Sequence, residues 1–165
     1  MAQNRGKQFE QVIRNAFEKV PNTTIIRLPD QTAGFKGGCN VCDFIVYHYP
    51  YQYFIECKTV HGNTFPFSNI TKNQREGMSR ECWKHGVRAG VIVWYVDKDV
   101  TKWIPIQVVE ELRNLGYKSY RFDKHNSGWK GEIHTVEVPG KKKRVFFDYD
   151  MESFFNKVNR KDAWK

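Results

Sequence analysis

The sequence predicts a mixed α/β fold, in which one mixed central sheet is flanked by helices. Residues 42–60 hold two stretches of aromatic and β-branched side chains on either side of Tyr49-Pro50, which is typical of a strand hairpin. Residues 89–96 are apolar on both faces, as in a central strand that helices cover on both sides. Helical periodicity before the hairpin and between these strands gives the expected order αβββαβ.

Length, composition and charge set limits on the class of protein. We treat residues 1–165 as one domain, with a core at about 4–116 and a C-terminal extension at about 117–165. No apolar run approaches the roughly 20 residues of a membrane span, and the N-terminus lacks a signal-peptide pattern, so we expect a cytoplasmic protein without a membrane partner. The net charge of +9 favours a polyanionic partner, nucleic acid first and anionic membrane second.

A helix, a short strand and a loop are expected before the hairpin. Asn4 is a candidate N-cap for a helix over residues 5–20, and Glu10 lies at the edge of its apolar stripe. Residues 24–28 form a short strand candidate. Residues 29–38 (PDQTAGFKGG) contain one proline and three glycines, which predicts a loop.

The segment after the hairpin has the start and stop signals of a helix. Thr71 to Gln74 fits a capping box, and Gly86 fits a C-terminal stop. Gln74, Met78 and Cys82 then share one stripe, which we expect to face the sheet. Later elements are expected as a strand at 102–106, a helix at 107–115, a weaker strand at 132–138, a turn at Pro139-Gly140 and a terminal helix from about 150.

Two acids and a lysine converge in the predicted hairpin. If Tyr49 and Pro50 form the middle of the turn, Asp43 lies directly opposite Glu56, with Cβ atoms about 5 Å apart. Like charges repel at that distance, so a hard divalent cation, Mg²⁺ or in its place Mn²⁺, is the natural occupant. Lys58 projects from the same strand face as Glu56, where an ammonium can help to activate a metal-bound water. This pattern favours metal-assisted phosphodiester hydrolysis; the alternative interpretation is a surface salt-bridge cluster.

The order of these and several other residues along the chain is similar to that of a known family. The order resembles the RecU group of Holliday junction resolvases, members of the PD-(D/E)xK nuclease superfamily, over residues 4 to about 95. The matching positions are Asn4-Arg5-Gly6 with Glu10, Asp43, Glu56-x-Lys58, Phe65-Pro66 and Gln74.

The resemblance implies a restriction-endonuclease-like core and a role for each matching residue. Asp43 and Glu56 would be the Mg²⁺ ligands, Lys58 the catalytic lysine, Glu10 an acid from the first helix and Gln74 a polar group from the second. It also implies a homodimer that cuts two strands symmetrically.

Two departures from the family pattern point to a compact, phage-encoded version in a bacterial or phage-infected cell. Cys42 stands where bacterial members have a threonine, and the segment before Asp43 is too short for their protruding stalk. The expected function is therefore a Mg²⁺-dependent endonuclease acting on branched DNA, in Holliday junction resolution during recombination and repair. The alternatives are a non-catalytic DNA-binding or recombination accessory protein, and a restriction- or flap-type nuclease of the same fold.

Other candidate ligands compete with this assignment. Asp30, in a literal Pro-Asp pair, is an alternative to Asp43, although a turn-forming aspartate is the simpler explanation. A four-cysteine zinc site is conceivable, but the spacing is irregular and Cys57 alternates to the strand face opposite Glu56, so buried thiols are the simpler interpretation. The cysteines concerned are Cys39, Cys42, Cys57 and Cys82.

Basic and aromatic residues complete the predictions. The candidate DNA contacts are Arg5, Lys7, Lys36, Lys72 and Arg75, with the basic run at 141–144 as a further possibility. The tryptophans Trp83, Trp94 and Trp103 are expected in the core. A third group either covers a dimer interface or completes the monomer core: Phe122, Trp129, Phe146 and Phe147.

Overall fold

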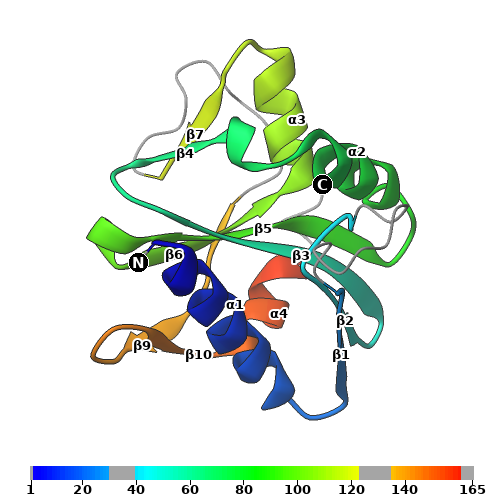
Figure 1. Ribbon diagram of the computed structural model, residues 1–165. Helices are drawn as coiled ribbons and strands as arrows, with labels where there is room; N and C mark the ends of the chain where they lie inside the picture. The colour runs from blue at the N-terminus through cyan, green and yellow to red at the C-terminus, as the bar shows by residue number, and fades with distance from the viewer. Residues whose placement is uncertain (1, 30–39, 123–134, 161–165) are drawn as a thin grey trace.

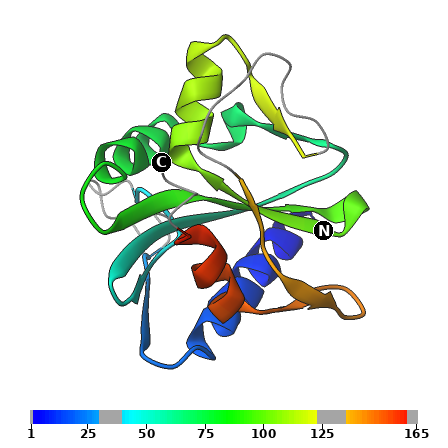
Figure 2. The same cartoon turned by 180° about the vertical axis from the view of Figure 1, so that it is seen from behind.

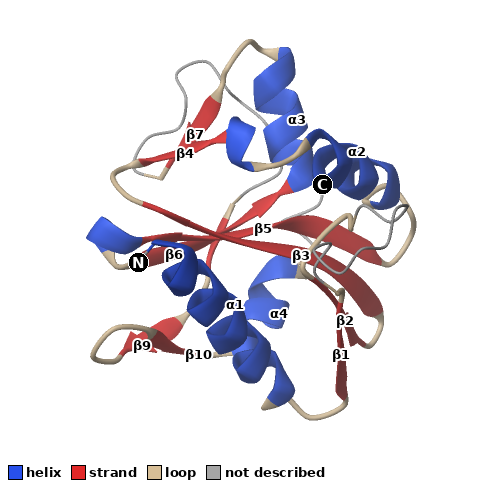
Figure 3. Cartoon of the chain, viewed as in Figure 1, coloured by secondary structure: helices blue, strands red, loops and turns tan. Residues whose placement is uncertain are grey.

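The computed structural model describes residues 2–29, 40–122 and 135–160, and within them a six-stranded mixed sheet forms the centre of the molecule (Figures 1 and 3). The strand order is β1-β2-β3-β5-β6-β8. The pair β3 and β5 is parallel, and every other neighbouring pair in this sheet is antiparallel. The strands are β1 (Thr23–Arg27), β2 (Phe44–His48), β3 (Tyr51–Val60), β5 (Val87–Tyr95), β6 (Val100–Pro105) and β8 (Val136–Glu137).

Helices cover both faces of this sheet. Seen from opposite sides in Figures 1 and 2, α1 (Ala2–Glu18) and α4 (Met151–Val158) lie on one face, and α2 (Lys72–Glu81) and α3 (Ile106–Asn114) lie on the other. The predicted mixed α/β class is confirmed, and the order α1-β1-β2-β3-α2-β5 contains the expected αβββαβ core.

Shorter elements extend this framework. Two small antiparallel pairs and two 3₁₀ turns connect the main elements. They are β4 (Thr64–Pro66) with β7 (Ser119–Arg121), β9 (Gly140–Lys142) with β10 (Phe147–Tyr149), and the turns η1 (Phe67–Asn69) and η2 (Val96–Lys98). Among the described residues, no helix is long and apolar enough to cross a bilayer.

The predicted hairpin register is confirmed. Ile45 pairs with Phe54 and Tyr47 with Gln52, as expected for a turn centred on Tyr49 and Pro50. The backbone pairing continues one step beyond β2, because the amide of Asp43 donates to the carbonyl of Ile55 at 3.1 Å. This register decides which side chains of β3 accompany Asp43.

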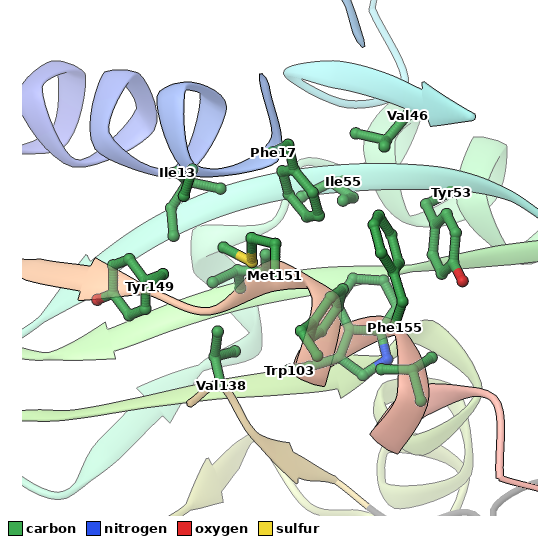
Figure 4. Packing of buried hydrophobic residues seen from close by; sticks show 14 of the residues in the cluster. Ile13, Phe17, Val46, Tyr53, Ile55, Trp103, Val138, Tyr149, Met151 and Phe155 are labelled. Atoms are coloured by element: carbon green, nitrogen blue, oxygen red, sulfur yellow. The ribbon is translucent and has the colours of Figure 1, made fainter. Parts of the chain in front are cut away.

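Aromatic side chains fill the core between the sheet and helices α1 and α4 (Figure 4). Phe17 of α1 lies 5.8 Å from Phe154 and 5.4 Å from Phe155 of α4, ring centre to ring centre. Trp103 of β6 meets Phe154 edge to face at 5.7 Å. The C-terminal helix therefore belongs to the same core as the N-terminal one, and burying such rings contributes on the order of 2 kcal/mol each.

The opposite core lies beneath α2 and α3. Strand β5 is fully buried from Ala89 to Tyr95, as its two apolar faces predict. Met78 and Cys82 of α2 pack against it, which confirms the predicted stripe of that helix. Leu112 of α3 completes the layer.

Several predicted boundaries are wrong, each for a local reason. Helix α1 begins at Ala2, so Asn4 lies inside it and is not its cap. Helix α2 ends at Glu81 with Cys82 as C-cap, and Gly86 instead adopts a left-handed turn (φ +76°) before β5. Gly140 is not in a turn but in β9, since it pairs with Tyr149 of β10.

The aromatic residues separate into buried and exposed sets. Trp94 and Trp103 are in the core as predicted, whereas Trp83 is 76% exposed because it follows the end of α2. Phe146 lies 5.3 Å from Trp94, and Phe122 lies 5.3 Å from Tyr95, so both pack within the monomer. Phe147 stacks on Tyr149 and likewise contacts the α1-side core, while Trp129 lies outside the described residues.

Candidate active site

Asp43 directly precedes β2 and lies beside the part of β3 that carries Glu56, as the hairpin register predicts. The amide of Cys57 donates to Oδ2 of Asp43 at 2.7 Å, and the amide of Asp43 donates to the carbonyl of Ile55. These two hydrogen bonds attach Asp43 to the residues on either side of Glu56. The position of the Asp43 carboxylate is thus set by sheet backbone.

Glu56 is the most deeply buried charged side chain of the site, with 2% of its surface exposed. Its Oε1 accepts hydrogen bonds from Nζ of Lys58 at 2.7 Å and from Nε2 of Gln74 at 2.9 Å. Its Oε2 is buried and has no hydrogen-bond partner within the part of the chain that the structure describes. A charged oxygen without a partner in the interior costs free energy, so a cation or a hydrogen-bond donor at this atom would stabilise the site.

The surroundings oppose ionisation of both acids. Burial, followed by the nearby charge of Glu56, raises the pKa of Asp43 to about 7. Burial also raises the pKa of Glu56, although the Lys58 ammonium and the Gln74 amide act in the opposite direction. Positive charge added near the two carboxyls would therefore favour their ionised forms.

Glu10 of α1 brings a third carboxylate into the neighbourhood. Its charge contributes to raising the pKa of both Asp43 and Glu56. Nε of Arg27, at the end of β1, donates to Oε1 of Glu10 at 2.9 Å. The structure therefore brings together all of the predicted catalytic set: Glu10, Asp43, Glu56, Lys58 and Gln74.

Arg27 is a site residue that the sequence reasoning missed. It pairs with Phe44 across β1 and β2, one position from Asp43, and the amide of Leu28 donates to the carbonyl of Asp43 at 2.9 Å. In the sequence, Arg27 is a single basic residue near the end of a predicted strand, and this is the only feature that could have indicated a role in the site. That signal is weak without knowledge of how α1 lies against β1.

The donor set of this site fits a hard divalent cation. Asp43 and Glu56 offer carboxylate oxygens, which Mg²⁺ and Mn²⁺ prefer. Oε2 of Glu56 is buried and has no hydrogen-bond partner among the described residues. The described residues contain no ready-made group of three or more acidic, histidine or cysteine side chains around a metal position. Water and substrate oxygens would therefore supply the remaining ligands, as is usual for Mg²⁺.

The described cysteines do not converge on a zinc site. Cys42 and Cys82 belong to the core under α2, whereas Cys57 packs toward the α1 side of the sheet, opposite Glu56 as predicted. Burial raises the pKa of the Cys42 thiol to about 12, which disfavours the thiolate that a zinc site requires. Cys39, like Asp30 and Lys36, lies outside the described residues.

The predicted DNA-binding cations differ in their surroundings. Arg5 and Lys7 are exposed on the first turns of α1. Lys72 is exposed near Glu76, at 3.8 Å, while Arg75 is mostly buried and donates to Glu110 at 3.1 Å. In the basic run, Lys141 and Lys142 lie in β9, and Lys142 pairs with Asp99.

Comparisons with known proteins give a similarity to a solved structure. No protein-family model matches the chain, and a search of curated proteins gave no significant match. Among solved structures, the chain is similar to Hjc, a Holliday junction resolvase from the archaeal hyperthermophile Archaeoglobus fulgidus. The similarity covers 62% of this chain and 78% of that chain, with 18% sequence identity and a TM-score of 0.46.

Proposed function

We propose that the protein is a metal-dependent endonuclease that hydrolyses phosphodiester bonds in branched DNA, with Holliday junctions as its substrate. The observation that carries this proposal is the buried carboxylate of Glu56, which lies beside Asp43 and is bound by Lys58, yet keeps one oxygen without a partner among the described residues. The net charge of +9 and the resemblance to RecU resolvases support DNA as the substrate.

In this mechanism, Asp43 and Glu56 would hold Mg²⁺ or Mn²⁺. When bound, such an ion lowers the pKa of a coordinated water and neutralises charge on the scissile phosphate. Lys58 is 26% exposed, so its ammonium can reach a phosphate at the mouth of the site while staying 2.7 Å from Glu56. There it would stabilise the charge that develops on phosphate oxygens.

The remaining residues act by holding the acids in place. Gln74 fixes the orientation of the Glu56 carboxylate through its 2.9 Å hydrogen bond to Oε1, so that Oε2 would be available to hold the ion. Glu10, held by Arg27, keeps negative potential next to Asp43 and Glu56 and so favours a cation between them.

A homodimer follows from the proposed substrate. A four-way junction has two-fold symmetry, and symmetric cutting needs two equivalent sites, whereas each chain carries one set of Asp43, Glu56 and Lys58. An isologous interface between two copies would supply both sites. Light scattering at micromolar concentration tests this, and a chain that stays monomeric on junction DNA would contradict it.

The decisive experiment compares substrates and metals. A labelled four-way junction, the matching linear duplex and its single strands are incubated with Mg²⁺, with Mn²⁺ and with chelator. We expect paired incisions in the junction, only with metal, and none by a Glu56→Gln preparation that controls for contaminating nucleases. Equal cleavage of the linear duplex would indicate a restriction-type enzyme, and binding without cleavage would indicate an accessory protein.

A further inference from the structure

A basic cavity lies on the far side of α2 from Glu56. Its volume is about 730 Å³, and residues of η1, the start of α2, the end of α3 and β7 line it. These elements lie in the upper part of Figure 1. Gln74 reaches from α2 to Glu56, while Lys72 and Arg75 of the same turn line the cavity. The first turn of α2 therefore contributes side chains both to the cavity and to the candidate active site.

Cations dominate the charge of this cavity. Lys72, Arg75, Arg113 and Lys118 all line it. Two carboxylates that are not among the lining residues pair with these cations: Glu110 accepts from Arg75 at 3.1 Å and lies 3.7 Å from Arg113, and Glu76 lies 3.8 Å from Lys72. Four positive against two negative charges leave an excess that suits a phosphate group.

The remaining lining is apolar and aromatic, apart from Ser68 and Ser119. Phe67, Ile70 and Tyr117 form part of the wall, beside Pro66. Aromatic faces next to cations are the combination that binds unpaired nucleotides, because bases stack on the rings while phosphates meet the cations. The volume lies within the range of about 300–1,000 Å³ that is usual for small-ligand pockets, which suits a nucleotide unit and excludes a duplex.

We infer that this cavity binds an unpaired segment of DNA, with its phosphates at Arg113, Lys118 and Lys72 and a base against Tyr117. The inference rests on the proposed function only in taking DNA as the substrate. Because α2 joins the cavity to Gln74, a strand held there runs alongside the active site. The protein would then prefer branched substrates in which a few bases near the cut are open.

Anisotropy of a fluorescent oligothymidylate of about ten nucleotides tests the inference, with the whole chain in chelator so that nothing is cut. The double variant Arg113→Ala, Lys118→Ala is compared with Lys98→Ala, Lys157→Ala, which removes the same charge away from the cavity. We expect at least about tenfold weaker binding by the cavity variant alone, and a salt slope reduced by about 1.4, the value for two lost phosphate contacts.

Glu110→Gln gives the opposite test, because it removes the carboxylate that competes for Arg75 and Arg113. We expect this variant, matched by circular dichroism to the wild type, to bind the oligonucleotide more tightly. The inference would be overturned if the cavity and control double variants bound the oligonucleotide with equal affinity. It would also be overturned if the cavity variant lost as much affinity for linear duplex as for the oligonucleotide, because the cations would then form a general phosphate-binding surface. Metal-dependent cleavage by the wild type is scored separately, so its absence would overturn the proposed function and leave the cavity result standing.

Discussion

Gln74 connects the start of a helix to a buried carboxylate. Its Oε1 accepts from the amide of Thr71 at 3.0 Å and completes the capping box of α2, while its Nε2 donates to Glu56 at 2.9 Å. The oxygen of the Gln74 side-chain amide thus caps the helix, while its nitrogen donates to the candidate active site. A glutamate at this position would satisfy the first requirement and fail the second, because a carboxylate has no hydrogen to donate.

Gln74→Glu should therefore separate helix capping from catalysis. The capping box is retained, so α2 should keep its N-terminus, but a negative charge next to Oε1 of Glu56 should lower the melting temperature through repulsion and reduce junction cleavage by about 10- to 100-fold. Single-turnover cleavage and thermal melting measure the two effects. Thr71→Ala is the matched control: it removes the other half of the capping box, costs about 1 kcal/mol of stability and leaves the Gln74 amide in place. A Gln74→Glu enzyme with wild-type cleavage would contradict the positioning role.

Asp43→Asn and Glu56→Gln should each abolish cleavage while junction binding stays intact or becomes tighter. Each change removes a proposed ligand and at the same time relieves repulsion between carboxylates and phosphates. Gel-shift titration in chelator and cleavage in Mg²⁺ report the two properties on the same preparations. Comparable cleavage by either variant would refute the assignment of these acids.

The metal-free protein should lose stability as the pH rises toward neutral. The folded-state pKa of Asp43, about 7, lies above its ordinary value of 3.8, so the stability linked to its proton is complete below about pH 4 and is lost as the pH rises through 7. This shift corresponds to an upper limit of about 4 kcal/mol, and the raised pKa of Glu56 acts in the same direction. Urea unfolding in chelator at pH 5 and pH 8 measures the loss.

Either of two changes, added Mn²⁺ or the substitution Asp43→Asn, should reverse that loss of stability at pH 8. Mn²⁺ should restore stability by pairing with the ionised acids, and Asp43→Asn should raise the stability of the metal-free protein relative to wild type. At pH 5 the same variant should gain much less. If Asp43→Asn raised the stability by the same amount at both pH values, ionisation of the Asp43 carboxyl would not be the cause of the stability loss.

Lys58→Ala should lose cleavage while it still binds Mn²⁺. The ammonium touches Glu56 at 2.7 Å but is not a ligand, so its loss removes a charge from the reaction and not an oxygen from the metal. Calorimetric titration of Mn²⁺ alongside single-turnover cleavage distinguishes the two roles. A variant that no longer binds Mn²⁺ would show that Lys58 is needed to keep Glu56 in position.

Gly77→Ala should impair the site through packing. A Cβ at Gly77 would lie 2.8 Å from Cβ of Val41, so α2 would have to move away from the segment that leads into Asp43. We expect a loss of about 1–3 kcal/mol in unfolding free energy together with slower cleavage. Gly6→Ala, in α1 with no atom near the added methyl, should instead raise stability by about 0.5–1 kcal/mol. Equal stability of the two variants would contradict the tight contact.

The sequence was sufficient for the hairpin and its acids because these depend on local rules. Side chains alternate along strands, and a turn at Tyr49-Pro50 then fixes Asp43 beside Glu56. The capping box likewise located Gln74 on the first turn of α2. These residues could be placed before any tertiary packing was known.

Contacts between distant elements could not be predicted in this way. The bond between Arg27 and Glu10 depends on how α1 crosses β1, and the exposure of Trp83 depends on where α2 stops against the sheet. Helix α4 was foreseen, but its place beside α1 was not. Each of these facts is set by packing between segments, which composition and periodicity do not encode.

The pairing of α1 with α4 has a consequence for protein synthesis. Phe17 needs Phe154 and Phe155 to close its side of the core, and those residues leave the ribosome long after the strands that carry Asp43 and Glu56. Until then α1 can pack against β1 and β3 but lacks its contacts with α4. The core on this side of the sheet would thus close only after α4 has been synthesised.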